Sequence, residues 1–289
     1  MAGGAHSGAL EELDTRPGRE TIVSALARRG LIAVSVAFLA ALLLAPLAVV
    51  FATALQGGLQ TYFQTFADPD TRAAIRLTLL TALVVVPVNT VFGLAASWAI
   101  AKFEFRGKSL LLTVIDLPIA VSPVISGMLF VLLFGMRGWF GAWLAANGIS
   151  IVFAIPGIMI ATLFVTFPYV ARELIPLMQQ LGNDEEEAAI TLGAGAWMTF
   201  FRVTLPKIRW GLLYGVILCN ARAMGEFGAV SVVSGHIRGL TNTMPLAIEA
   251  LYNDYDFTGA FAVASLLTLL AVLTLVLKSL VARTGYRRR

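Results

Sequence analysis

Apolar segments recur along this chain at the length that a helix needs to cross a lipid bilayer, which is about 20 residues. Hydrophobic residues make up 58% of the 289 residues and charged residues only 13%, whereas soluble domains carry roughly 25% charged residues. A globule of this length has too little interior to bury so much apolar surface, so we expect an all-α polytopic membrane protein. Its six predicted transmembrane helices are 31–55, 74–101, 109–136, 154–178, 208–234 and 258–282.

The remaining chain is too short for a soluble domain with its own core. Residues 1–30 are predicted to form a cytoplasmic N-terminal tail, 31–282 the transmembrane domain, and 283–289 a cytoplasmic basic tail. A cleaved signal peptide is not expected, because the first apolar segment exceeds the roughly 7–15 residues of a signal-peptide core.

Lysine and arginine are divided unequally between alternate loops. Basic residues gather on cytoplasmic loops, so both termini and the 179–207 loop are predicted to be cytoplasmic. The same bias accounts for the net charge of +4 without a nucleic-acid partner. Of the 21 basic residues, sixteen lie on the cytoplasmic side, four outside and Arg222 within a span. The sixteen are Arg16, Arg19, Arg28, Arg29, Lys102, Arg106, Lys108, Arg172, Arg202, Lys207, Arg209, Lys278, Arg283, Arg287, Arg288 and Arg289, and the four are Arg72, Arg76, Arg137 and Arg238.

The sequence lacks the residue clusters of metal sites and of ATP hydrolysis. Cys219 is the only cysteine, and His6 and His236 are far apart, so neither a metal site nor another cofactor is expected. The glycine-rich stretch 193–195 lacks the Lys-Ser or Lys-Thr of a phosphate-binding loop. We therefore expect a chain that is not itself an enzyme.

The longest polar interruption, 182–206, predicts a short helix, a turn and a second helix. Asn183 or Asp184 is expected to cap the first helix, and Asp184 with Glu187 has the spacing of a capping box. Acidic residues in the first turn suit the positive end of the helix dipole.

The small side chains of Ala188 and Ala189 favour helix and permit another protein to approach closely. Gly193 is expected to end the helix in the left-handed conformation, and Pro206 suits the first turn of the next helix. On local physics alone, an ordinary cytoplasmic hairpin is the alternative.

This segment resembles a cytoplasmic loop of permease subunits in binding-protein-dependent ABC importers. The resemblance lies in the residues and their spacing: Glu187-Ala188-Ala189, then Gly193 after three residues, Val203 after nine, and Leu205-Pro206 after one more. Val203 stands where that family usually has isoleucine. The resemblance covers about 70–282 and implies the type I permease fold, with a coupling helix that sits in a groove of a separate ATPase. The implied ATPase-coupling residues are Glu187, Ala188, Ala189, Gly193, Leu205 and Pro206.

A second stretch, 220–230, resembles permeases that carry oxyanions. The continuation 231–239, with 243–246 and Asp254-Tyr255, is similar to the W-type subunit of sulfate/thiosulfate importers. Molybdate permeases share 226–229 but less of this continuation, and a molybdate or tungstate importer is the alternative. The resemblance implies a second homologous permease subunit, two ATP-binding subunits, an extracytoplasmic sulfate-binding protein and a location in the cytoplasmic (inner) membrane.

Arg222 and Glu226 lie four residues apart inside the fifth predicted span, so they can pair on one helix face. Ionisable groups in a span are costly and face a cavity or a partner. We regard both as candidates for the translocation path, and a purely structural ion pair as the alternative.

Ser122 is the third path candidate, because Pro118 and Pro123 flank it and free backbone groups that need partners or a wet cavity. A packed kink explains the same pattern. An ion-coupled secondary transporter would need coupling carboxylates in mid-membrane, where only Glu226 and Asp116 qualify. A membrane-embedded enzyme would need a cluster of acids, bases or metal ligands, which the sequence lacks.

Overall fold

The computed structural model describes residues 20–286, and every regular element in that range is a helix. The predicted all-α class is therefore confirmed for the described chain. The chain divides into two compact units, Met1–Val49 and Val50–Arg289. The boundary falls inside the first helix, α1 (Glu20–Leu55), which begins well before the predicted span at 31.

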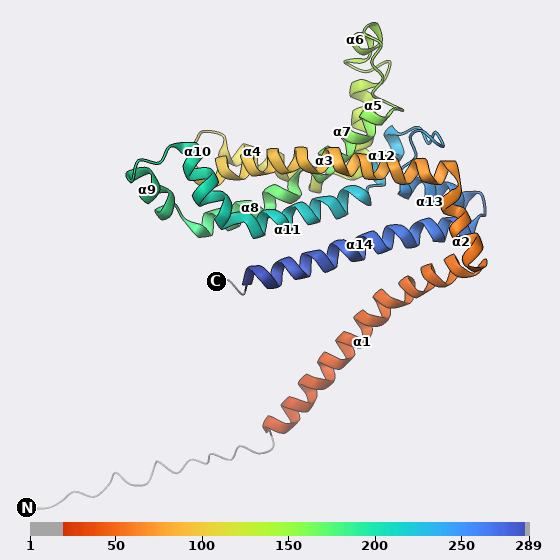
Figure 1. Cartoon of the computed structure of the whole chain (residues 1–289), viewed down its shortest axis with the longest axis horizontal. Coiled ribbons are helices and arrows are strands. Elements are labelled where there is room, and N and C mark those ends of the chain that lie inside the picture. Colours follow the sequence, from red (N-terminus) through yellow and green to blue (C-terminus); the bar gives the residue numbers. More distant parts are fainter. Residues whose placement is uncertain (1–19, 287–289) are drawn as a thin grey trace, which may run out of the picture. The chain divides into compact units, whose positions relative to one another are not determined.

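The second unit contains all the other helices, and Figure 1 shows their order. They are α2 (Gly58–Ala67), α3 (Pro69–Lys102), α4 (Lys108–Ala120), α5 (Pro123–Phe134), α6 (Gly141–Ala146), α7 (Ile155–Thr166), α8 (Pro168–Leu181), α9 (Asp184–Thr191), α10 (Ala196–Thr199), the π-helix η1 (Phe200–Thr204), α11 (Leu205–Met224), α12 (Gly228–Val233), α13 (Met244–Asn253) and α14 (Phe257–Tyr286).

Four stretches of helix are long and apolar enough to cross a membrane, and the bent pair α4–α5 raises the number to five within the described residues. The four stretches match the first, second, fourth and sixth predicted spans, and the bent pair α4–α5 matches the third. The predicted count of six is not confirmed. The four stretches are Ala27–Leu55, Pro69–Lys102, Ile155–Leu181 and Phe257–Leu277.

The third predicted span is not one straight helix, because the chain turns by 107° between α4 and α5. Val121 and Ser122 have extended backbone angles, with ψ of 136° and 134°. The ring of Pro123 disfavours helical geometry at the residue before it, and it then starts α5 in a position that proline tolerates.

The fifth predicted span is also shorter than expected. Its helix α11 ends at Met224 and the chain breaks at 225–227 before α12 begins. The helix carries three charged residues, Lys207, Arg209 and Arg222. Because of these charges it is not among the stretches apolar enough to cross a membrane.

Helices α3, α8 and α11 form the centre of the second unit. Val86, Val170, Leu174 and Ile208 belong to one buried cluster. Gly93 permits the contact between α3 and α8, because a Cβ atom there would lie 2.7 Å from Cβ of Val170. Such close approach at small residues is typical of helix packing in membranes.

A buried amide adds a polar link between α3 and α7. The Asn89 side chain is fully buried, and its Nδ2 donates to Oγ1 of Thr166 at 2.8 Å and to the carbonyl of Leu163 at 3.2 Å. Away from water such bonds fix one register of the two helices.

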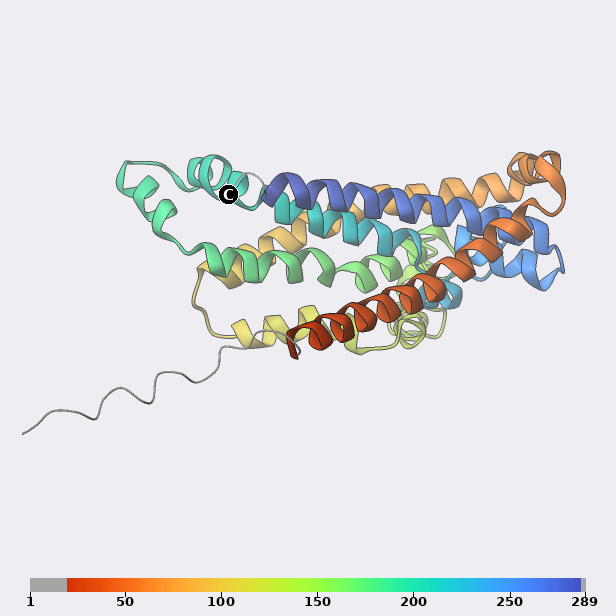
Figure 2. The same ribbon diagram turned by 90° about the horizontal axis from the view of Figure 1, so that it is seen from below.

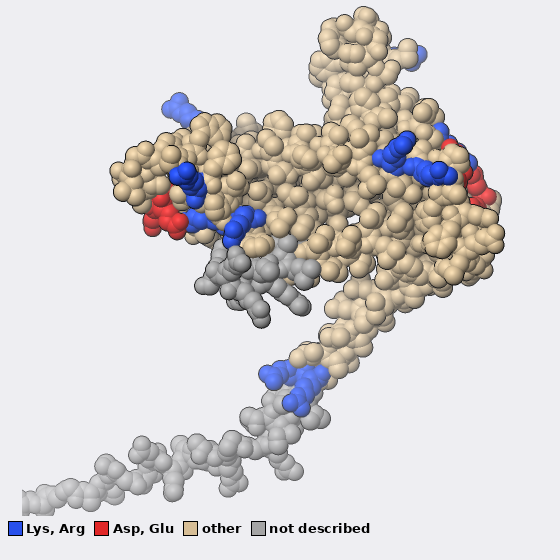
Figure 3. Space-filling view, viewed as in Figure 1, with Lys and Arg blue, Asp and Glu red and all other residues tan. Residues whose placement is uncertain are grey.

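The helical hairpin α9–α10 lies at one end of the second unit, and α2 and α13 lie at the other, in both ribbon views (Figures 1 and 2). Figure 3 shows acidic side chains at these two ends and none on the face between them. Basic side chains lie beside the acidic ones, and the middle of this face carries neither, as expected for a protein that spans a bilayer.

Candidate functional site

Helix α9 ends as its sequence predicts. Gly193 has φ of +89°, a conformation that glycine adopts without steric cost. Its N–H donates to the carbonyl of Ile190 at 2.9 Å, and the N–H of Ala194 donates to the carbonyl of Ala189 at 3.0 Å. These two bonds form a Schellman motif, which turns the chain from α9 toward α10.

The start of α9 differs from the prediction. Asn183 is the N-cap, but its side chain makes no capping bond, and Asp184 is already helical. The expected capping box between Asp184 and Glu187 is therefore wrong. Oδ1 of Asn183 instead accepts from Nζ of Lys102 at 2.9 Å, so a tertiary partner takes the atom that would have capped the helix.

The second half of the segment runs as α10, η1 and α11 without a break. Pro206 lies in the first turn of α11, beside Leu205, as predicted. Phe200 begins η1 and its ring lies 5.3 Å from that of Trp98 on α3, so an aromatic contact holds this stretch against the bundle.

The inner side of α9 is tied to the bundle by ion pairs that the sequence reasoning missed. Oε2 of Glu186 lies 2.8 Å from Nζ of Lys102, the last residue of α3. Oε1 of Glu186 accepts from Oγ1 of Thr204 at 2.9 Å. Glu185 pairs with Lys207 on α11 at 2.9 Å.

The outer side of the hairpin is unusually apolar for an exposed surface. We call it the hairpin surface, and its large apolar residues are Ile190, Leu192, Trp197, Met198 and Phe201. Leu192 is 89% exposed and Trp197 77% exposed. Glu187 and Ala188 are also exposed, and Ala189 is half-buried. Within this set the rings of Trp197 and Phe201 stack, and exposed apolar surface of this kind is typical of protein or membrane interaction sites.

Arg222 and Glu226 form the predicted ion pair, with Nη1 of the arginine 2.5 Å from Oε2 of the glutamate. The two do not share a helix, however, because Glu226 lies in the break at 225–227. Its side chain is 1% exposed, whereas that of Arg222 is 30% exposed. The other carboxylate oxygen, Oε1, accepts from the N–H of Ala229 at 2.8 Å and so binds the start of α12.

Ser122 lies in the break between α4 and α5 and is exposed. This break packs against the one at 225–227, because a Cβ on Gly228 would lie 2.9 Å from Cβ of Pro123. The structure thus brings the Ser122 break beside the Glu226 break. Ser126, one turn further along α5, is buried and donates to the carbonyl of Ser122 at 3.2 Å.

Asp116, the other intramembrane carboxylate, lies 2.7 Å from Nε of Arg172. Arg172 is on α8, inside a membrane-crossing stretch rather than in a loop. Both carboxylates that a secondary transporter could use are thus held by arginines. Among the described residues, no group of three or more His, Cys, Asp or Glu could hold a metal ion.

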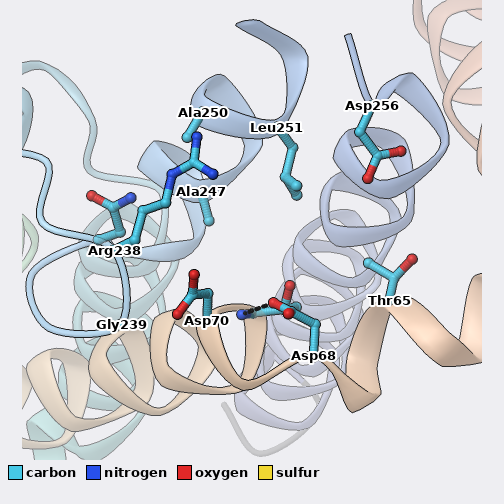
Figure 4. Close-up of a pocket in the computed structure, with 11 residues that line it drawn as sticks. Thr65, Asp68, Asp70, Arg238, Gly239, Ala247, Ala250, Leu251 and Asp256 are labelled. Atoms are coloured by element: carbon cyan, nitrogen blue, oxygen red, sulfur yellow. Dashed lines mark hydrogen bonds between the residues drawn. The ribbon is translucent and has the colours of Figure 1, made fainter. Parts of the chain in front are cut away.

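A cavity of about 280 Å³ lies at the end of the unit opposite α9. Figure 4 shows the carboxylates of Asp68, Asp70 and Asp256 around it. Asp68 accepts from the N–H of Thr71 at 2.8 Å and Asp256 from that of Gly259 at 2.9 Å, so both carboxylates cap helices. Arg238 also lines the cavity and pairs with Asp254.

Comparisons with known proteins agree with this arrangement. The family model described as "Binding-protein-dependent transport system inner membrane component" matches residues 89–285. The sulfate transport system permease protein CysW of Synechocystis sp. is 52% identical over 89% of this chain and 94% of its own. CysW of Escherichia coli is also 52% identical, over 86% of each chain. CysT, another sulfate transport system permease protein of Escherichia coli, is 35% identical over 88% of this chain and 92% of its own.

The fold is also that of a solved transporter. A chain of a bacterial alginate ABC transporter, crystallised with a periplasmic protein bound to an alginate pentasaccharide, matches with a TM-score of 0.74 at 16% identity. The match covers 92% of this chain and 96% of that one. The structural likeness shows the fold, and the family model and the relatives above establish that this chain belongs to the inner membrane components of binding-protein-dependent ABC transport systems.

Proposed function

We propose that this chain is the permease subunit of an ATP-driven importer of sulfate or thiosulfate in the cytoplasmic membrane. The observation that carries the proposal is the 52% identity to two sulfate transport system permease proteins over most of the chain. The ion-paired state of Asp116 and Glu226 favours this function over ion-coupled transport.

The 182–206 segment is the proposed coupling element, through which a separate ATPase drives the permease. Support comes from the hairpin surface, which is exposed and apolar, and from the ion pairs that fix its inner side. The proposed coupling residues are Glu187, Ala188, Ala189, Gly193, Leu205 and Pro206.

Arg222, Glu226 and Ser122 are proposed to border the translocation path. The guanidinium of Arg222 is partly exposed next to a buried carboxylate, so it can attract an anion. Because Glu226 already balances its charge, a dianion would not be held too tightly to leave. The chain is non-helical at the breaks beside Ser122 and Glu226, and non-helical backbone at membrane depth is tolerated where it is buried in protein or lines a cavity.

The proposed assembly pairs this chain with a homologous permease subunit, two ATP-binding subunits and an extracytoplasmic sulfate-binding protein. The presence of both CysW and CysT in Escherichia coli supports a heterodimer. Three carboxylates and only one guanidinium, that of Arg238, line the cavity at the proposed outer end, so its lining is net negative and repels a free dianion within the Debye length, which is about 8 Å at physiological salt. Delivery by a binding protein overcomes that repulsion.

Sulfate uptake is the direct test. In cells that lack their own sulfate importers, this chain with its partner subunits should restore uptake of radiolabelled sulfate, and excess thiosulfate should compete. Excess molybdate should not compete, because the relatives at 52% identity are sulfate permeases. Cells without the ATPase subunit provide the control, and competition by molybdate alone would support the molybdate alternative.

The proposed orientation predicts the location of reporter fusions. Fusions after Arg106, after Gly195 and at the C-terminus should report a cytoplasmic location, and fusions near Asp68 and Asp254 an external one. The opposite ends occupied by α9 and α13 in Figures 1 and 2 support this arrangement. A cytoplasmic signal at Asp254 would contradict it.

A further inference from the structure

Helix α9 depends on polar contacts for its position. None of its residues is buried, and its large apolar side chain, Ile190, is 58% exposed. A helix without a buried apolar face gains little from packing. What fixes α9 against the bundle is therefore its set of ion pairs and hydrogen bonds.

Glu186 makes the most protected of these contacts. Its side chain is 14% exposed and that of its partner Lys102 is 9% exposed. The ammonium group of Lys102 has three donors, and all are used, by Glu186, by Asn183 and by the carbonyl of Gly182. An ion pair so shielded from water is stronger than an exposed one.

Two long helices meet at the carboxylate of Glu186. Through Lys102 it holds the end of α3, which begins at Pro69 beside the acidic cavity. Through Thr204 it holds η1, which continues into α11 and so leads to Arg222 in the last turn of that helix. Both helices run from α9 toward the opposite end of the unit (Figure 1).

We propose that Glu186 is the positioning residue through which movement of α9 is transmitted to α3 and α11. This inference rests on the proposed coupling function of the 182–206 segment. Glu186 faces the bundle and not the hairpin surface, so its role is to pass on the movement rather than to bind the ATPase. When both Glu186 links are removed, α9 keeps only the bonds of Lys102 to Asn183 and Gly182 at its start and the exposed Glu185–Lys207 pair, so α3 and α11 should follow its movement less closely.

The test is the amount of ATP hydrolysed per sulfate transported, in proteoliposomes that contain the whole importer and its loaded binding protein. Glu186→Ala removes both links and should raise this ratio at least about fivefold, the lower end of typical coupling between sites. Glu186→Gln keeps an acceptor for Thr204 and should raise it less. Co-purification of the ATPase should stay within about twofold of the wild type, because the hairpin surface is unchanged.

Glu185→Gln is the matched control. It breaks the pair with Lys207, which also joins α9 to α11, but the Glu185 side chain is 64% exposed and exposed pairs contribute little. The control should therefore keep the wild-type ratio.

Two outcomes would overturn the inference. One is a wild-type ratio in Glu186→Ala, and the other is a parallel loss of ATPase binding, ATP turnover and transport at constant ratio, which indicates a merely structural role. Failure of the proposed function looks different, because the wild-type importer itself would then show no ATP-dependent sulfate transport.

The distance between spin labels at Leu192→Cys and Arg106→Cys, both exposed sites, gives a second measurement that does not depend on transport. The distribution of this distance should be narrow with Glu186 present and broad in Glu186→Ala. A distance distribution that stays narrow in Glu186→Ala would contradict the proposal that Glu186 positions α9.

Discussion

Gly193→Val is expected to lower sulfate uptake by about tenfold while the protein still inserts in the membrane. Gly193 adopts φ of +89°, where a residue with a side chain pays roughly 1–2 kcal/mol, which corresponds to a factor of about 5–30 in an equilibrium. The turn between α9 and α10 should open and disrupt the hairpin surface. ATPase turnover of the reconstituted importer with loaded binding protein should fall in parallel.

Gly195→Ala is the matched control for this turn. Gly195 has φ of −71° and no atom within 4 Å of an added Cβ, so the variant should behave as wild type. Ala189→Trp tests the same contact by added bulk and should weaken ATPase binding. Normal ATPase binding and normal stimulated turnover in both Gly193→Val and Ala189→Trp would mean that this segment is not the coupling element.

Arg222→Ala is expected to destabilise the purified permease and to abolish most uptake. It leaves the carboxylate of Glu226, 1% exposed, without its cation, and removal of one partner from a buried pair costs about 3–5 kcal/mol. At roughly 2–4 °C per kcal/mol for a domain of this size, the thermal midpoint should fall by about 6–12 °C at the lower cost. Thermal unfolding in detergent measures this shift.

The double variant Arg222→Ala/Glu226→Gln separates stability from transport. The neutral amide no longer needs a cation and still offers an oxygen to the N–H of Ala229, so the thermal midpoint should largely recover. Uptake should remain low if Arg222 attracts the anion. Full recovery of uptake would mean that the Arg222–Glu226 pair is only structural. Arg238→Ala, which breaks an exposed pair with Asp254, should change stability by less than about 1 kcal/mol.

Local sequence signals predicted the parts of the fold that depend on local physics. The apolar segment 74–101 gave a helix within a few residues of α3. Gly193 was expected to be left-handed and Pro206 to lie in a first turn, and both are. In each case the free energy that fixes the feature comes from residues adjacent in sequence. It is the steric energy of the backbone at Gly193 and Pro206, and the burial of one continuous apolar segment for α3.

Features that depend on distant partners escaped the same reasoning. Hydropathy is summed along the chain and carries no direction, so it treated the 107° bend at Ser122 as part of a straight span. Proline marked that region, but a kink and a full break have the same sequence signal. Lys102 and Glu186 are separated by 84 positions, and a pairing at that range is fixed only when α3 and α9 have packed.

The exposed hairpin surface has a consequence for how cells must produce this protein. The isolated chain leaves Leu192 and Trp197 exposed, and exposed apolar side chains promote aggregation and recognition by chaperones and proteases. If the proposed ATPase covers the hairpin surface, copies of the permease without it should be degraded faster than assembled ones. Balanced synthesis of the subunits would then be a physical consequence of this surface.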